Sequence, residues 1–290
     1  MNERTGPVRA PAVAGAFYPD DAVDLTHLVE NCFSGRRGPG SLPVRHRSDE
    51  RHIRAAIVPH AGYIYSGPIA AHAYHALAAE RPPSTIVVLG VNHRARGAPA
   101  ALSAREWSTP LGTVPVDREL VHALAKGPIV IDEAAHATEH SIEVQLPFLQ
   151  YVFPKPRIVA LSVSFGTLAF LTDVAAVVRR ATHGRDVLFL SSTDFSHYLP
   201  ASDAQRLDRH AIDEILARRG EGLYRTVLAE DISMCGIAPT TVLLELLADE
   251  PLEARLLRWG HSGETETMRD VVGYASLLLE SVASLGATGP

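Results

Sequence analysis

Three apolar segments of this chain are each followed, within a few residues, by a histidine. The segments and their histidines are Ile53–Val58 with His60, Thr85–Gly90 with His93, and Asp186–Ser191 with His197. In a parallel sheet such residues emerge at one edge, where α/β proteins bind ligands. A lone histidine is usually a hydrogen-bonded loop residue, but three at equivalent positions favour one shared site. Because imidazole binds metals and transfers protons near neutral pH, the predicted chemistry is metal binding or acid–base catalysis.

Cys235 is another candidate for chemistry, because it stands just before a predicted helix that begins at Pro239. A helix N-terminus shifts a thiol toward thiolate, which is both a nucleophile and a soft metal ligand. The structural alternative is a buried small apolar residue, the usual fate of a free cysteine, and it is preferred when Cys235 is considered alone. Cys32 lies inside an amphipathic pattern and is expected to be structural.

The run Thr138–Gln145 has two interpretations, which we weigh equally. Ser141 as a helix cap, with Glu143 in the first turn, is a purely structural one. His140 and Glu143 could equally line a pocket and orient a ligand histidine. The sequence contains no phosphate-binding glycine loop, GxSxG elbow or HExxH helix, so it gives no support to P-loop proteins, α/β-hydrolases or zincins.

The elements that must position these residues alternate between short apolar runs and amphipathic stretches. The predicted strands are Ile53–Val58, Thr85–Gly90, Arg157–Val163, Asp186–Ser191 and Val271–Leu278. The predicted helices are Asp20–Cys32, Pro68–Ala79, Ser141–Tyr151, Phe170–Ala181, Asp203–Arg218 and Pro239–Ala248. Nearly continuous apolar strands indicate a sheet covered on both faces. We therefore expect an α/β fold, a three-layer α/β/α arrangement around a largely parallel or mixed sheet, in one domain over residues 1–290 with a flexible loop at Ser34–Glu50.

Composition narrows the class of protein. The net charge is -6 with acidic and basic residues interspersed, so no nucleic-acid partner is expected. No apolar run approaches the roughly 18 residues of a membrane-spanning helix, and the N-terminus lacks the pattern of a secretory signal. The two cysteines cannot form a disulfide framework. We therefore expect a soluble cytoplasmic protein without a membrane association.

In combination, several motifs resemble those of the Memo family, which includes the bacterial and archaeal AmmeMemoRadiSam system protein B. They are Pro59-His60-Ala61-Gly62-Tyr63 with Tyr65-Ser66-Gly67, Leu89-Gly90 with Asn92-His93, Ser108-Thr109-Pro110-Leu111-Gly112, Glu139-His140-Ser141-Ile142-Glu143, Asp194-Phe195-Ser196-His197, Cys235-Gly236 with Pro239, and Val272-Gly273-Tyr274-Ala275. The resemblance covers nearly the whole chain. One departure is Val91, where the family commonly has proline, and it affects only the expected loop geometry.

The resemblance implies a fold like that of the class III extradiol dioxygenases, which are non-haem iron enzymes. By that likeness His60 and His93 match two metal ligands, and Cys235 stands where the dioxygenases have a glutamate ligand. His197 matches their acid–base histidine, with Asp194 beside it. The implied metal is iron or copper, and zinc is a further option, because a thiolate in place of a carboxylate favours softer metals. Ring-opening activity does not follow from the fold.

The resulting hypothesis is a metal-dependent, oxidoreductase-type or dioxygenase-like enzyme acting on an unidentified small-molecule or peptide substrate. His197, oriented by Asp194, would transfer protons, and the residues shaping the pocket would be Tyr63, Tyr65, His140 and Glu143. One alternative is a non-catalytic copper-, iron- or peptide-binding protein, and another is a zinc-dependent hydrolase. The name of the bacterial family further implies a functional association with a radical SAM protein and an AMMECR-type protein.

Overall fold

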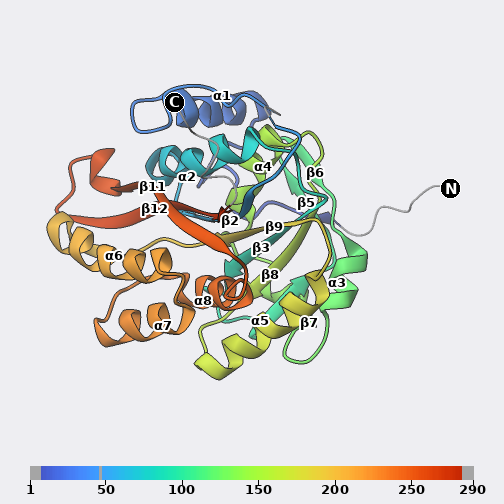
Figure 1. The fold of residues 1–290 in the computed structure, drawn as a ribbon. Helices are drawn as coiled ribbons and strands as arrows, with labels where there is room; N and C mark the ends of the chain where they lie inside the picture. Colours follow the sequence, from blue (N-terminus) through green and yellow to red (C-terminus); the bar gives the residue numbers. More distant parts are fainter. Residues whose placement is uncertain (1–7, 46–47, 283–290) are drawn as a thin grey trace.

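The structure, a computed structural model, describes residues 8–45 and 48–282, and its centre is a nine-stranded mixed sheet (Figure 1). Four parallel strands form the middle of the sheet in the spatial order β2 (Ile53–Val58), β9 (Val187–Ser192), β3 (Thr85–Val91) and β8 (Ile158–Val163). All but one of their residues are buried, because helices cover both faces. The predicted mixed α/β sheet is confirmed, with these four strands within one or two residues of their expected bounds.

Further strands, joined to the parallel centre by the antiparallel strands β4 and β12, extend the sheet on both sides. Beyond β8 lie β4 (Ala100–Ser103) and β7 (Val130–Ile131), and beyond β2 lie β12 (Asp270–Ser281), β10 (His197–Pro200) and β11 (Leu252–His261). A separate three-stranded sheet contains β1 (Val8–Arg9), β5 (Glu106–Thr109) and β6 (Gly112–Val114). The long strand β12 pairs with β2 through its C-terminal half and with β10 through its N-terminal half, so it joins the centre of the sheet to the segment that carries His197.

Helices form the outer two layers (Figure 1). One face carries α1 (Ala22–Ser34), α2 (Tyr63–Ala78) and α4 (Leu146–Val152). The other carries α8 (Ile237–Leu246), which packs directly on β3, β9 and β8, together with α5 (Leu168–Thr182), α7 (Gly220–Ala229), α6 (Ala201–Leu216) and α3 (Arg118–Leu124). Short 3-10 helices are η1 (Glu133–Ala135), η2 (Glu143–Gln145) and η3 (Ser262–Glu264). None of the helices in residues 8–45 and 48–282 has the length and apolar character needed to cross a membrane.

Helix α2 begins at Tyr63, five residues before the predicted start at Pro68. Proline has no N–H for the carbonyl four residues earlier, which ordinarily excludes it from a helix interior. Here that carbonyl, on Ile64, accepts a hydrogen bond from Arg37 Nη2 at 2.6 Å and another from Thr265 Oγ1 at 3.2 Å. Tertiary donors thus replace the missing bond, and the helix reaches back to within three residues of His60.

The run Ser141–Tyr151, predicted as one helix with Ser141 as one candidate cap, is η2 followed by α4. The Ser141 hydroxyl does not cap it. The hydroxyl oxygen accepts a hydrogen bond from Val91 N at 2.9 Å and donates to Val91 O at 3.2 Å. Of the two interpretations, the helix cap is the one that the structure contradicts, because the hydroxyl bonds the end of β3 and holds this run against the strand that precedes His93.

The loop predicted to be flexible, Ser34–Glu50, includes residues 46 and 47, which lie outside the described residues. In its described part Arg37 donates to the carbonyls of Ile64 and Tyr65 at 2.6 and 3.0 Å. These bonds attach the loop to the first turn of α2, so this part is held against the helix that follows His60.

Candidate metal centre

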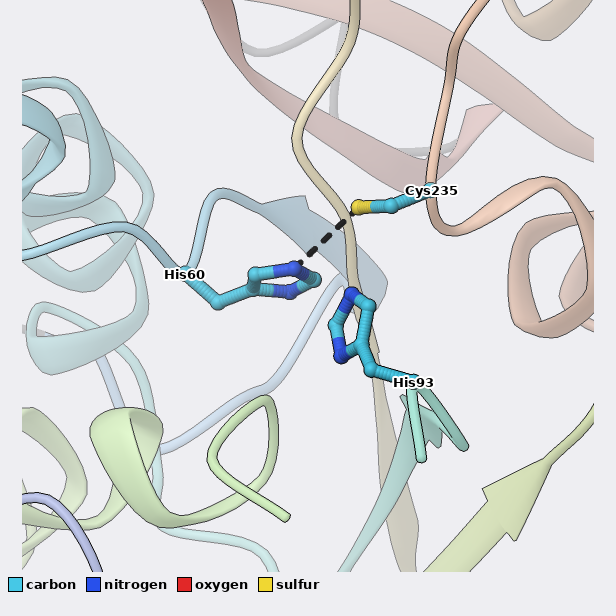
Figure 2. A group of neighbouring side chains, drawn as sticks. All are labelled: His60, His93 and Cys235. Atoms are coloured by element: carbon cyan, nitrogen blue, oxygen red, sulfur yellow. Dashed lines mark hydrogen bonds between the residues drawn. The ribbon is translucent and has the colours of Figure 1, made fainter. Parts of the chain in front are cut away.

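The ends of β2, β9 and β3 bring His60, Asp194 and His93 to one edge of the sheet, and the loop before α8 adds Cys235. One nitrogen of each imidazole and the Cys235 sulfur all lie within 4.8 Å of one another. His60 Nε2 is 3.1 Å from Cys235 Sγ, and the two imidazole rings are nearly perpendicular with centroids 5.2 Å apart. Figure 2 shows the three side chains converging from three separate segments. Small adjustments would bring all three atoms within bonding distance of one ion.

His60 is almost completely buried, and its hydrogen bonds determine its tautomer. The Ser192 hydroxyl donates to Ser141 O at 2.7 Å, so the same oxygen must accept from His60 Nδ1 at 2.9 Å. Nδ1 therefore carries the proton, and the lone pair of Nε2 faces Cys235. Burial, with the neighbouring His140 and His93, lowers the pKa of His60 well below its ordinary value. His60 is thus a neutral imidazole, the form that binds metals.

His93 is oriented by Glu139, a residue that the sequence analysis did not select. Glu139 Oε1 lies 2.9 Å from His93 Nδ1, and Oε2 accepts from His93 N at 2.9 Å. Burial raises the pKa of Glu139, but the hydrogen bond and charge of His93 and the Ser141 N–H outweigh it and lower that pKa to about 2. An ionised carboxylate only accepts, so His93 keeps its proton on Nδ1 and leaves Nε2 for a metal. The position of Glu139 directly before His140 was the signal that could have identified it.

His140 forms one wall of the centre. Its ring stacks on that of His93 at 4.7 Å and is perpendicular to that of His60 at 5.3 Å, and burial lowers its pKa to about 4. His93, Glu139 and His140 also have the spacing of a second metal site. However, Glu139 Oε1 already accepts the backbone N–H groups of His140 and Ser141, each at 2.9 Å. This group is therefore better explained as the network that orients His93.

Cys235 is half-buried, and the environment of its sulfur contradicts one prediction. Burial raises the pKa of the thiol, and the Asp194 carboxylate raises it further. The expected shift toward thiolate was wrong because burial outweighs the hydrogen bonds that favour the thiolate. Cys235 stands two residues before α8 begins, and these bonds come from Asp194 N, 3.2 Å from Sγ, from the Thr193 hydroxyl and from the Cys235 backbone. A thiolate here requires a cation to replace the proton.

Asp194 and His197 adopt different roles from the predicted pair. Asp194 Oδ1 accepts from the backbone N–H of His60 at 2.7 Å, and burial raises the Asp194 pKa to about 6. The ring of His197 is instead held by Ser233, whose carbonyl lies 2.8 Å from Nδ1. Among the described residues no hydrogen bond joins Asp194 to His197. The prediction that Asp194 orients His197 was therefore wrong, and Asp194 fixes the backbone beside His60.

Three of the predicted pocket residues direct their polar groups elsewhere. The Tyr63 hydroxyl is buried and donates to Val144 O at 2.5 Å, and the Tyr65 hydroxyl reaches Glu266 Oε1 at 3.5 Å. Glu143 is fully buried and pairs with Arg9 at 2.6 Å. These hydrogen bonds give the three polar groups structural partners, and the part of these residues in shaping the pocket stays a prediction. The ring of His140 contacts the rings of both candidate ligand histidines.

Replacing Glu139 with glutamine should weaken metal binding by about 10–100-fold, the usual effect of removing a carboxylate that orients a ligand histidine. The amide can donate toward His93 Nδ1 and so favours the wrong tautomer. Isothermal titration with zinc(II) measures the affinity. The matched control is Glu133→Gln, which alters a carboxylate that accepts from Ala104 N and Ser103 Oγ outside the centre. Equal losses in the two variants would contradict the assigned role of Glu139.

The chain is similar to known proteins over most of its length. The profile of the family described as Memo-like protein matches residues 9–278. A MEMO1 family protein of Methanothermobacter thermautotrophicus is 42% identical over 279 residues, which cover 93% of this chain and 99% of the relative. One from Methanopyrus kandleri is 41% identical over 278 residues, covering 93% and 98%. Among solved structures, an uncharacterized protein of Escherichia coli K12 aligns at 14% identity and a TM-score of 0.49, covering 79% of this chain and 99% of that one. The match to the family profile and the identity to the curated relatives both extend over most of the sequence, and the chain belongs to the Memo family.

Proposed function

We propose that this chain binds one transition-metal ion through His60 Nε2, His93 Nε2 and Cys235 Sγ, and uses it for redox chemistry on a small-molecule or peptide substrate. The observation that carries the proposal is the convergence of these three atoms within 4.8 Å. Both imidazoles direct their Nδ1 protons away from the centre, toward Ser192 and Glu139. Their lone pairs are therefore available on the side that faces the thiol.

The donor set limits which metals fit. Two imidazoles and a sulfur suit copper(I), zinc(II) or iron with a thiolate ligand, because softer donors favour softer ions. The thiol proton would be released on binding, so affinity would rise with pH. Three protein ligands leave positions open for other molecules, as in catalytic rather than purely structural sites. When bound, iron or copper would supply one-electron redox chemistry, and we propose iron or copper as the resident ion.

The protein groups around this set have separate tasks. Ser192 and Glu139 hold the two ligand rings in one tautomer, so little reorganisation is needed when an ion binds. His197 Nδ1 is engaged by Ser233, which leaves Nε2 able to accept a proton from a substrate. The side chain of His93 is 27% exposed, so the centre is reachable from solvent. We therefore assign His197 the role of proton acceptor.

That same exposure of His93 favours a second candidate, a protein that takes up and releases copper or iron without turnover. Exchange requires an exposed ligand, and His93 provides one. Tight stoichiometric binding of copper(I), with no consumption of substrate or oxygen, would favour this candidate. Zinc in the isolated protein, with activity in the absence of oxygen, would instead favour a zinc-dependent hydrolase.

The deciding experiment is metal analysis of protein purified without chelators or a histidine tag, together with an anomalous-scattering map of its crystals. We expect one equivalent of iron or copper between His60, His93 and Cys235. Oxygen uptake with catechols and thiols then separates the enzyme from the metal-handling protein. A metal-free protein that cannot be loaded, and whose His60→Ala variant is indistinguishable from the parent, would overturn the proposal.

A further inference from the structure

The segment Ser233–Gly236 is hydrogen-bonded to two places in the chain, Thr193–Asp194 and His197. On one side Thr193 Oγ1 accepts from Gly236 N at 3.0 Å, and Asp194 N donates to Cys235 Sγ at 3.2 Å. On the other side the segment holds His197 through Ser233. The loop that carries the candidate metal ligand Cys235 is therefore the same loop that holds the candidate proton acceptor.

Ser233 makes two hydrogen bonds with His197. The backbone N–H of His197 donates to Ser233 Oγ at 2.7 Å, and His197 Nδ1 lies 2.8 Å from the Ser233 carbonyl oxygen. A carbonyl oxygen only accepts, so the ring must carry its proton on Nδ1. In the neutral ring Nε2 is then the unprotonated nitrogen, and it has no hydrogen-bond partner among the described residues. The Ser233 hydroxyl holds the His197 backbone in place, so that the His197 ring lies beside the Ser233 carbonyl. That carbonyl then determines the tautomer of the ring.

The backbone around His197 has an unusual conformation where these two hydrogen bonds form. Strand β10 pairs with β12 through His197 and Leu199, with an irregularity in register between them, and Tyr198 has a φ of 57°. This left-handed conformation is unfavourable for a residue with a side chain, and such outliers persist where surrounding contacts impose them. The Tyr198 side chain is 78% exposed, so its own burial does not compensate for the strain. The bonds between Ser233 and His197, together with the pairing of His197 and Leu199 with β12, are contacts that maintain it.

We propose that Ser233 is a positioning residue that sets the tautomer of His197 and ties that ring to the loop bearing Cys235. The inference rests on the proposed function for its chemical meaning, because a free Nε2 matters only if His197 serves the metal centre. It assigns His197 the accepting form at the start of a reaction. The substrate class would then be one that donates a proton from an O–H, N–H or S–H group bound at the centre.

The test is a long-range proton–nitrogen NMR correlation of histidine-labelled protein at one fixed, mildly basic pH, which distinguishes the two neutral tautomers. In the wild type we expect His197 to be predominantly protonated on Nδ1. Ser233→Ala removes the hydroxyl that accepts the His197 N–H, and we expect the ratio of Nδ1–H to Nε2–H tautomers to fall about threefold or more. Ser233→Thr retains a hydroxyl at an exposed position and should restore the wild-type ratio.

The matched control is Thr193→Val, which removes a hydrogen bond from the opposite side of the same loop and should leave the His197 ratio unchanged. A folded Ser233→Ala protein with the wild-type ratio would overturn the proposal, as would a wild type protonated on Nε2. Titration of the wild type with zinc(II) is scored separately. Absence of zinc binding would count against the proposed function, whereas the tautomer ratio of the metal-free protein would still decide the role of Ser233.

Discussion

Replacing Cys235 with serine should reduce the affinity for copper(I) by about 100-fold or more, because a hydroxyl is a poor ligand for a soft ion and stays protonated. Serine preserves the shape of the side chain, so the loss reports the sulfur itself. Competition against a chromophoric copper(I) chelator measures the affinity. Copper(II) offers a second reading, since the sulfur-to-metal charge-transfer band should disappear in the variant.

The chain provides its own control in its other cysteine. Cys32 lies in α1, is 2% exposed, and its sulfur is 3.9 Å from Tyr63 O, away from the candidate ligands. Cys32→Ala should therefore keep both the affinity and the charge-transfer band. If Cys235→Ser binds copper(I) as tightly as Cys32→Ala does, then the Cys235 thiol is not the third ligand beside His60 and His93, and the proposed ligand set is wrong.

Replacing Glu143 with glutamine should lower the free energy of unfolding by about 3–5 kcal/mol, because it leaves a buried guanidinium without its counter-charge. Glu143 is fully buried and Arg9 is 5% exposed. The carboxylate also accepts from the Tyr18 hydroxyl at 2.6 Å and from the backbone of Ala12 and Val13 at 2.8 and 3.0 Å. Urea denaturation of metal-free protein followed by circular dichroism measures the loss.

An exposed ion pair serves as the control for this second prediction. Glu221 pairs with Arg225 one turn later on α7, and both side chains are more than half exposed. Glu221→Gln should change the unfolding free energy by less than about 0.5 kcal/mol, since solvent screens such pairs. A similar small effect in Glu143→Gln would show that the buried pair contributes no more than a surface one.

The same variant separates a structural role of Glu143 from a role at the metal. Its carboxylate anchors the N-terminal segment, whose Phe17 ring lies 4.7 Å from that of His140 and whose Phe17 carbonyl accepts from Tyr63 N at 2.9 Å. None of its hydrogen bonds reaches His60, His93 or Cys235. The folded fraction of Glu143→Gln should therefore still bind one equivalent of metal. Loss of metal binding without loss of stability would instead show that Glu143 acts at the metal centre.

The elements that the sequence did not reveal have local patterns that disagree with their structure. β11 alternates apolar and charged residues from Leu252 to Leu256, but the alternation shifts by one residue at Leu257, where its pairing with β12 is irregular. α7 contains Gly220 and Gly222, which lower helix propensity. A Cβ on Gly220 would lie 2.3 Å from Glu245 Oε1, so a larger residue there would displace the Glu245 side chain of α8.

By itself the sequence determined the central parallel strands and the gathering of His60 and His93, because strand ends in a parallel sheet share one edge and apolar runs mark those ends. Cys235 precedes a helix, and only the resemblance to the Memo family placed it with these histidines. Tertiary structure alone decided which nitrogen each ring offers and what holds it. His60 depends on Ser192, His93 on Glu139 and His197 on Ser233, which are 132, 46 and 36 residues away along the chain. Hydrogen bonds act over about 3 Å, and no local pattern records which distant groups the fold brings within that range.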